Sequence, residues 1–169
     1  MEKSSQFYLF IIMQKFIYLL MAFNFTNFSY GQLKFDQNNV RFEPKLMKVA
    51  GNKYEVHIFS IIDKGFHIYA NKQPKGSLST PTTFTFSKNI FIKMEEQLKE
   101  IGNKVSLVEP LSGYPAAFYL ENVEFVKYFT LRGKTKTQLK GKINYQLCNE
   151  TKCFAIKDYL FEISIDGKM

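Results

Sequence analysis

The sequence contains little glycine or proline, and this shortage excludes two classes of protein. Nine glycines and five prolines among 169 residues are too few for a collagenous or low-complexity chain. Aromatic residues make up 17% of the sequence and hydrophobic residues 46%, which is more than a disordered chain contains. The length suits one domain with a real core and is short for two. We therefore expect a single folded domain.

Arginine is also scarce, although the chain is basic. The formal net charge is +8, yet Arg41 and Arg132 are the only arginines and the lysines are spread singly along the chain. Nucleic-acid sites usually combine clustered basic residues with arginines that make bidentate contacts. We therefore expect no nucleic-acid partner. The sequence also shows no hydroxyl-nucleophile motif, phosphate-binding loop or paired-carboxylate constellation, and no cofactor is expected.

The most apolar stretch of the chain runs from Phe7 to Phe28 and is interrupted at Gln14-Lys15. Neither half is long enough to cross a bilayer as a helix, which takes about 20 apolar residues. A signal peptide instead needs a basic residue, an apolar run of roughly 7 to 15 residues and small residues at the cleavage site. Lys15, the run from Phe16 to Phe23 and Ser29-Tyr30-Gly31 fit this second pattern.

We therefore predict a signal peptide over residues 1–31, cleaved before Gln32, and a domain over residues 32–169. No stable membrane anchor would remain after cleavage. The alternative is an uncleaved N-terminal anchor. A lipoprotein is not expected, because no cysteine lies near the cleavage point. In an oxidising compartment a pair of cysteines is expected to form a disulfide.

From Lys53 onward, short β-branched and aromatic runs alternate with turn residues, as in an all-β domain. Their spacing of roughly 8 to 12 residues suits a β-sandwich. The expected strands are 54–62, 66–69, 82–86, 105–108, 123–131, 139–147 and 154–165. The segment 92–101 has apolar residues three and four apart, as in a helix. We expect it to be extended or only briefly helical, because strand pairing overrides local propensity.

The only two cysteines, Cys148 and Cys153, flank four polar residues between two strand-like runs. Such a hairpin places them opposite each other with Cα atoms about 4.5–5.5 Å apart, a separation that a disulfide can bridge. A bond closing so short a loop contributes only about 2 kcal/mol, and strained or exposed disulfides exchange readily. A structural disulfide and a redox couple both remain open. Zinc is not expected, because His57, an ordinary strand residue, and His67, expected to be partly exposed after a turn, show no ligand-like spacing.

Three segments make the sequence resemble a known family: KGFHIY at 64–69, PTTF at 81–84 and LKGKINYQLCNETKC at 139–153. Together they resemble the N-terminal domain of the thiol:disulfide interchange protein DsbD, in its Bacteroidota-type stand-alone versions. The resemblance covers roughly Phe35 to Ile165. The tyrosine before the first cysteine, the polar residues between the cysteines and the order of the segments are specific in combination.

This resemblance implies an immunoglobulin-like β-sandwich in the periplasm or otherwise exported. Its cysteine pair would pass electrons, by thiol-disulfide exchange, from a membrane reductant to thioredoxin-like periplasmic proteins. By the same resemblance, Cys153 is the thiol that forms the mixed disulfide, Cys148 is the resolving thiol and Tyr69 lies beside the pair. A cap loop over the disulfide would fall at 111–114, so Tyr69 and Tyr114 are expected to face the partner.

The sequence departs from the family pattern in two ways. Phe154-Ala155-Ile156 stands where the family has one residue followed by two prolines, so the strand beyond Cys153 is expected to set the sulfur differently. The chain stops at Met169 without the membrane and thioredoxin-like parts, so a membrane thiol reductase is expected in trans. The alternative function is a non-catalytic exported sandwich that binds a protein and keeps Cys148–Cys153 as a structural disulfide.

Overall fold

The computed structural model describes residues 39–167, and the predicted signal peptide and its cleavage site lie outside this range. The described chain forms eleven strands in three antiparallel sheets. The first sheet has the order β1-β2-β8-β5, formed by Val40–Ala50, Lys53–Ile62, Val123–Leu131 and Ile92–Ile101. The second has the order β11-β9-β4, formed by Lys157–Asp166, Lys136–Tyr145 and Thr83–Phe86. The third has the order β10-β3-β7-β6, formed by Leu147–Asn149, Phe66–Tyr69, Pro115–Tyr119 and Lys104–Val108.

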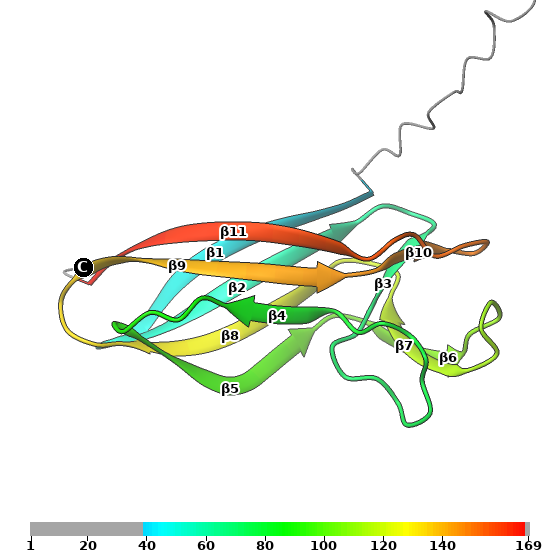
Figure 1. Cartoon of the computed structure of the whole chain (residues 1–169), viewed down its shortest axis with the longest axis horizontal. Coiled ribbons are helices and arrows are strands. Elements are labelled where there is room, and N and C mark those ends of the chain that lie inside the picture. Colours follow the sequence, from blue (N-terminus) through cyan, green and yellow to red (C-terminus); the bar gives the residue numbers. More distant parts are fainter. Residues whose placement is uncertain (1–38, 168–169) are drawn as a thin grey trace, which may run out of the picture. The chain divides into compact units, whose positions relative to one another are not determined.

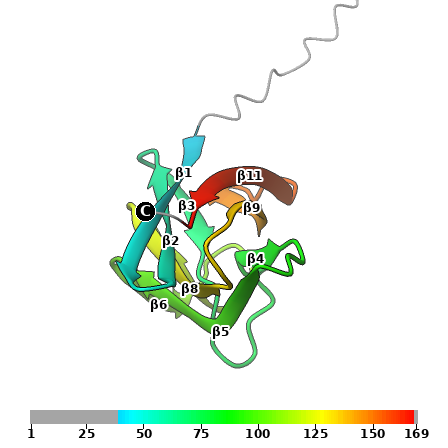
Figure 2. The ribbon, with the colours of Figure 1, turned by 90° about the vertical axis from the view of Figure 1, so that its left-hand side faces the viewer.

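The first two sheets face each other as the layers of a sandwich, and the third lies at one end of it (Figures 1 and 2). This arrangement confirms the expected all-β, immunoglobulin-like β-sandwich. Alternate residues of the strands are buried because successive side chains of a strand point to opposite faces. The largest fully buried side chains of the main core are Ile58, Ile68, Tyr119, Phe125, Phe129, Leu131, Leu139, Ile143 and Ile165. Within residues 39–167, no helix is long and apolar enough to cross a membrane.

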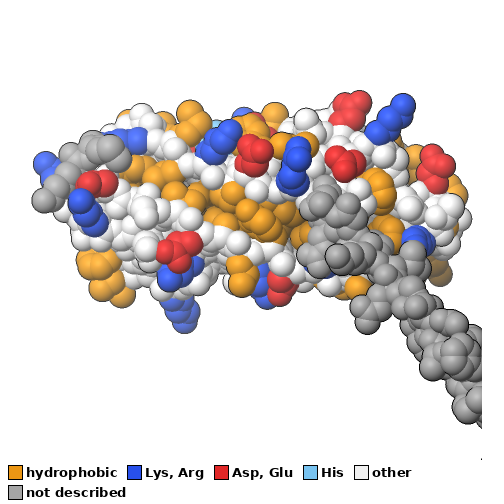
Figure 3. Space-filling view, turned by 90° about the horizontal axis from the view of Figure 1, so that it is seen from above, with side chains coloured by type: hydrophobic (Ala, Val, Ile, Leu, Met, Phe, Trp, Pro, Cys, Tyr) orange, Lys and Arg blue, Asp and Glu red, His pale blue; other side chains and the backbone are white. Residues whose placement is uncertain are grey.

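Aromatic side chains close the seam between β1 and β11, which belong to different sheets. The ring of Phe42 lies 4.9 Å from that of Tyr145 and 5.2 Å from that of Tyr159. The hydroxyl of Tyr159 also donates a hydrogen bond to the carbonyl of Phe42. Seen from above (Figure 3), apolar side chains form a band along the middle of the molecule, between lysine and acidic side chains.

Strand β5 confirms that segment 92–101 is extended in spite of its helix-like spacing. Its pairing with β8 shifts register between Met94 and Leu98, so the residues between them bulge out. Met94 and Leu98 both pack against the core, as residues an even number of positions apart do in a strand, whereas Ile101, the third residue of the helix-like spacing, is 43% exposed. The ammonium of Lys127 donates a hydrogen bond to the carbonyl of Glu96 within the bulge.

The strand predicted over 139–147 is in fact divided between two sheets. Strand β9 ends at Tyr145, Gln146 lies between strands, and β10 starts at Leu147 in the third sheet. Strand β11 begins at Lys157 rather than at the predicted Phe154. The chain thus leaves the sandwich at Gln146, makes a separate hairpin, and returns. That excursion places the cysteines on the end sheet.

The end sheet has two differently used faces. Ile68, Ala117, Tyr119 and Leu147 point into the main core. Their neighbours on the other face, Tyr69, Ala116, Phe118 and Cys148, form a second small buried cluster with Val105 packed against it. Cys148 therefore lies on the face of the end sheet that does not pack into the main core.

Candidate redox site

Cys148 and Cys153 form a disulfide across a tight hairpin. Their backbones are flanked by two hydrogen bonds of 2.9 Å, from the Asn149 amide to the Lys152 carbonyl and from the Phe154 amide to the Leu147 carbonyl. The cysteines thus occupy the non-hydrogen-bonded position of an antiparallel pair, where Cα atoms approach most closely. Their Cα atoms are 4.0 Å apart, closer than the separation predicted from the sequence.

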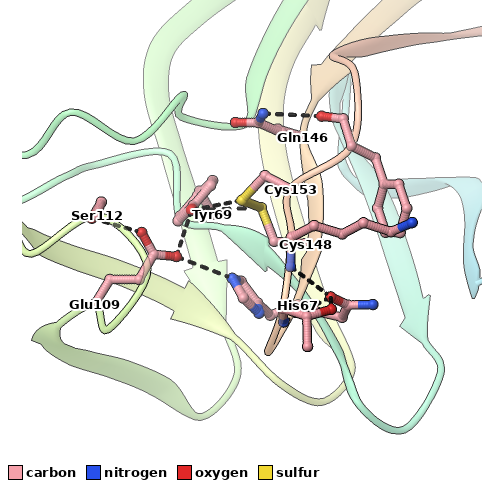
Figure 4. Close-up of a disulfide and its surroundings, with 11 residues drawn as sticks. His67, Tyr69, Glu109, Ser112, Gln146, Cys148 and Cys153 are labelled. Carbon is pink, nitrogen blue, oxygen red and sulfur yellow. Dashed lines mark hydrogen bonds and ion pairs between the residues drawn. A yellow bond between two sulfur atoms is a disulfide. The ribbon is translucent and has the colours of Figure 1, made fainter.

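Polar side chains hold both ends of this hairpin. At the tip, the Asn149 carboxamide oxygen accepts hydrogen bonds from the amides of Thr151 and Lys152 and from the Thr151 hydroxyl, as in an Asx turn. At the base, the Gln146 carboxamide donates a hydrogen bond of 3.0 Å to the Phe154 carbonyl (Figure 4). These contacts fix the path of the chain on both sides of the disulfide.

The two cysteines differ in exposure. Cys148 is fully buried, with 0% of its surface exposed, whereas Cys153 is exposed. A thiolate from another protein attacks a disulfide by direct contact with one sulfur. In this geometry Cys153 is the cysteine that another protein can reach.

Tyr69 lies against both sulfurs, as expected for the aromatic beside the pair. Its hydroxyl oxygen is 3.4 Å from the Cys153 sulfur and 3.5 Å from the Cys148 sulfur. The hydroxyl proton goes to the Glu109 carboxylate, because those oxygens are only 2.6 Å apart and a carboxylate is a far stronger acceptor than a disulfide sulfur. Burial, together with the hydrogen bond to Glu109, raises the pKa of Tyr69 well above its usual value.

Glu109 and Ser112 connect the loop predicted to be the cap with the disulfide, and the sequence did not reveal this. Glu109 is buried, and its second carboxylate oxygen accepts a hydrogen bond from Ser112 at 2.9 Å. Backbone hydrogen bonds between Glu109 and Tyr114 and between Gly113 and Glu109 close the turn. Gly113 has φ +71°, a conformation that glycine adopts readily. The turn reaches the disulfide through Glu109 and Tyr69 (Figure 4).

Tyr114, predicted to face the partner, lies on this turn and is 46% exposed. Its backbone amide donates a hydrogen bond to the Ser112 hydroxyl oxygen. The structure thus brings Cys148, Cys153 and Tyr69 together. Tyr114 lies on the neighbouring turn, which contacts Tyr69 through Glu109. A partner-facing role for Tyr114 stays a prediction.

The prediction that His67 is partly exposed is wrong, because His67 is buried. It lies directly opposite Cys148 in the pairing of β3 with β10, and its ring packs 4.6 Å from that of Phe118. Its Nε2 atom lies 3.6 Å from the Glu109 carboxylate. Burial lowers the pKa of His67, an effect that Glu109 opposes. The strand that covers His67 comes from far along the sequence, so the local turn gave no sign of it.

The site consists of an exposed cysteine bonded to a buried one, beside the hydroxyl of Tyr69 and the buried carboxylate of Glu109. This arrangement suits thiol-disulfide exchange chemistry. Among residues 39–167, no group of three or more histidine, cysteine or acidic side chains is placed to hold a metal ion.

Sequence comparison finds no matching family model and no matching curated protein. Among solved structures, the N-terminal periplasmic domain of ScsB from Proteus mirabilis matches with a TM-score of 0.55 and 12% identity, over 79% of this chain and 48% of that one. The chain shares its fold with the ScsB domain. It spans about half of that chain's length.

Two further structures match less closely. The N-terminal domain of DsbD from Neisseria meningitidis, in the reduced form, has a TM-score of 0.48 and 18% identity, over 74% of this chain and 86% of that one. The yeast GGA1 GAE domain has a TM-score of 0.40 and 13% identity, over 76% and 92%. Such low identities show at most a common fold.

Proposed function

We propose that this protein is an exported thiol-disulfide exchange module whose reactive pair is Cys153 and Cys148. The observation that carries the proposal is the asymmetry of the disulfide, which joins an exposed cysteine to a fully buried one. A disulfide kept only for stability has no need of one exposed cysteine, and a loop this short gives little stabilisation. The resemblance of the segments at 64–69, 81–84 and 139–153 to the DsbD N-terminal domain supports the same function.

The exchange proceeds in two balanced steps. A thiolate of the partner attacks the Cys153 sulfur, a mixed disulfide forms, and Cys148 leaves as a thiolate. The second thiol of the partner then attacks the mixed disulfide and releases Cys153. The partner's dithiol is oxidised to a disulfide, Cys148 and Cys153 are reduced by two electrons, and the two protons of the partner's thiols end on the cysteines. The reverse sequence reduces an oxidised partner.

Tyr69 is placed to assist the leaving sulfur. A thiolate at Cys148 would be a buried charge, which is costly without a hydrogen-bond donor. The Tyr69 hydroxyl lies 3.5 Å from that sulfur and already contacts Glu109. It can therefore donate to the thiolate while it is present and return to Glu109 after the thiolate is protonated.

In the cell, electrons would come from a membrane thiol reductase supplied in trans and would pass to thioredoxin-like periplasmic proteins. Support for this route comes from the family resemblance and from the fold shared with a periplasmic domain. No metal or organic cofactor takes part in the proposed steps.

A redox titration of the purified protein tests the proposal. A redox module should equilibrate with thioredoxin-like proteins and have a reduction potential between about −120 and −270 mV. Reduced thioredoxin should also convert the disulfide to the dithiol, as measured by thiol alkylation and mass spectrometry. A potential well below about −300 mV, together with no reaction with thioredoxin, would instead identify a structural disulfide in a non-catalytic binding protein.

A further inference from the structure

A pocket lies beside the disulfide hairpin, on the same face of the end sheet as Cys148. Its volume is about 470 Å³, within the range of pockets that bind ligands. Val105 of β6, His67 of β3 and Phe118 of β7 line it from the sheet. The hairpin tip lines it from another side with Asn149 and Glu150, which directly follow Cys148.

Leucines from three separate parts of the chain line this pocket. Leu107 lies on β6, Leu111 lies on the turn after β6, and Leu120 directly follows β7. They are 42%, 47% and 48% exposed, respectively. Single exposed leucines are common, but several around one hollow mark an interaction site. The apolar lining favours an apolar occupant.

The charged groups of the pocket narrow the choice further. Glu109 and Glu150 both line it, and His67 is the sole histidine there. The Nε2 atom of His67 is buried and makes no hydrogen bond within the described residues, with the Glu109 carboxylate 3.6 Å away, and burial lowers the pKa of this histidine against the effect of Glu109. The pocket therefore presents two carboxylates and no compensating lysine or arginine, so an acidic occupant would be repelled.

We propose that this pocket receives an uncharged apolar side chain of the thioredoxin-like partner, from a segment flanking the partner's reactive thiol. This inference rests on the proposed exchange function and adds the feature that selects the partner. Cys153 is five residues from Cys148 and lies on the same short hairpin. A protein whose thiol contacts Cys153 must therefore lie against this hairpin. The same hairpin forms a wall of the pocket, so the docked protein also covers the pocket mouth.

A side chain inserted here would act as an anchor for docking. Interfaces obtain most of their affinity from a few residues that fill well-packed pockets near the centre of the interface. A small dithiol such as dithiothreitol reaches the exposed cysteine without docking and gains nothing from the pocket. Damage to the pocket should therefore slow reduction by a protein and leave reduction by dithiothreitol unchanged.

Strand β6 offers a matched pair of variants for this test. Leu107 pairs with Ala116 and lines the pocket, whereas the adjacent Val108 pairs with Pro115, is 64% exposed and does not line it. Leu107→Asp removes the apolar contact and adds a carboxylate, and Val108→Asp makes the same change on the opposite face. Both are exposed positions on an edge strand, so both variants should fold.

The rates to measure are those at which reduced thioredoxin and dithiothreitol reduce the disulfide of the full chain and of each variant. We expect Leu107→Asp to slow reduction by thioredoxin about tenfold or more, which corresponds to the loss of roughly 1.4 kcal/mol of docking free energy. Its rate with dithiothreitol, and both rates of Val108→Asp, should stay within about twofold of the unmodified protein.

Equal thioredoxin rates for the two variants would overturn the pocket assignment while leaving the exchange function intact. A slowing of Leu107→Asp with dithiothreitol as well as thioredoxin would also overturn it, since the substitution would then have disturbed the disulfide itself. Failure of the unmodified protein to react with thioredoxin would refute the exchange function, and the pocket assignment with it.

Discussion

Two buried tyrosines make the same hydrogen bond, but only one of them touches the disulfide. Tyr69 donates to Glu109 at 2.6 Å, and Tyr119 donates to Glu100 at 2.8 Å. The pKa of each is raised by burial and by its carboxylate partner. Tyr119 points into the main core, whereas Tyr69 lies against both sulfurs. Comparing variants of Tyr69 and Tyr119 therefore distinguishes the loss of a buried hydrogen bond from an effect on the cysteines.

We predict that Tyr69→Phe and Tyr119→Phe lower the free energy of unfolding by similar amounts, about 1.5–3 kcal/mol for a hydrogen bond to a charged group. Only Tyr69→Phe should raise the pKa of the Cys148 thiol, because it removes the donor placed to stabilise the thiolate. The ultraviolet absorbance of the thiolate, followed against pH in a Cys153→Ala background, measures this pKa. An equal change in both tyrosine variants would contradict a specific role for Tyr69.

The sequence predicted the site residues that lie within motifs. It did not predict the site residues whose burial or role depends on tertiary packing. Cys148, Cys153 and Tyr69 lie within short recognisable segments, and they are together in the structure. The burial of His67 and the role of Glu109 depend on strand pairings between distant segments. A turn residue in front of a strand looks exposed until the strand that covers it is known.

At the scale of elements, the departure from the family's two prolines has little structural consequence for Cys153. The contacts that position Cys153 involve Phe154, through its amide to Leu147 and its carbonyl to Gln146. Ala155 and Ile156 come after these contacts, are exposed, and precede the start of β11. Proline fixes φ and removes a donor, which matters little at a position outside the ladder.

We therefore predict that the double variant Ala155→Pro/Ile156→Pro exchanges with thioredoxin within about twofold of the unmodified rate, since substitutions outside packed or hydrogen-bonded positions have small effects. The control is Gln146→Ala, which removes the hydrogen bond at the base of the hairpin and should change the rate more. A large change in the proline variant alone would show that the segment after Phe154 positions the sulfur.

Strand positions were predictable where alternation was uninterrupted. Strand β8 matches its predicted bounds at Val123–Leu131, whereas β1 and β7 were not predicted. Both missed strands contain a proline, Pro44 within β1 and Pro115 at the start of β7. Proline is tolerated in an edge strand or at the first residue of a strand, and such positions are apparent only once strand order is known.

At the scale of the whole molecule, the two histidines give opposite dependences of stability on pH. His57 forms hydrogen bonds with Glu55 and Glu124. Burial opposes the charge of His57, but these carboxylates outweigh it and raise the pKa. Burial lowers the pKa of His67. His57 thus stabilises the fold below its unfolded pKa of 6.5, a contribution that is lost as pH rises through the raised value.

His67 acts in the other direction, because the unfolded chain takes up its proton more readily than the folded chain. Its contribution is lost as pH falls from 6.5 toward the lowered value. We predict that His57→Gln removes a decrease in the free energy of unfolding above pH 6.5, and that His67→Gln removes a decrease below it. Urea denaturation across this pH range measures both. Identical pH profiles for the two variants would contradict the assigned directions.

The N-terminal segment is tested separately, since residues 1–38 lie outside the described structure. Lys15, the apolar run after it and Ser29-Tyr30-Gly31 predict cleavage before Gln32. N-terminal sequencing of the exported protein should therefore begin at Gln32. A chain that retains Met1 or Met13 would favour the uncleaved anchor.

The roles of the two cysteines differ most clearly when each is removed in turn. Cys148→Ala leaves the exposed Cys153 thiol with no neighbour to resolve a mixed disulfide, so a covalent adduct should accumulate with a thioredoxin that lacks its own second thiol. Cys153→Ala leaves only the fully buried Cys148, which a partner cannot reach, so no adduct should form. Both variants lose the same disulfide, worth about 2 kcal/mol, and Cys148→Ala also removes a fully buried sulfur, so the control is that each variant remains folded under the assay conditions.

Non-reducing electrophoresis and mass spectrometry measure the adducts after each variant is mixed with a thioredoxin that keeps only its attacking cysteine, activated as a mixed disulfide with thionitrobenzoate, because an intact thioredoxin would resolve the adduct with its own second thiol. An adduct formed by Cys153→Ala alone would exchange the two roles, and it would require the hairpin to open, because Cys148 is covered by the second cluster of the end sheet. If neither variant forms an adduct, the Cys148–Cys153 bond of the unmodified protein is a structural disulfide. Because Cys153 is exposed and Cys148 is buried, the two variants test the proposed function by showing which of the two thiols reacts with another protein.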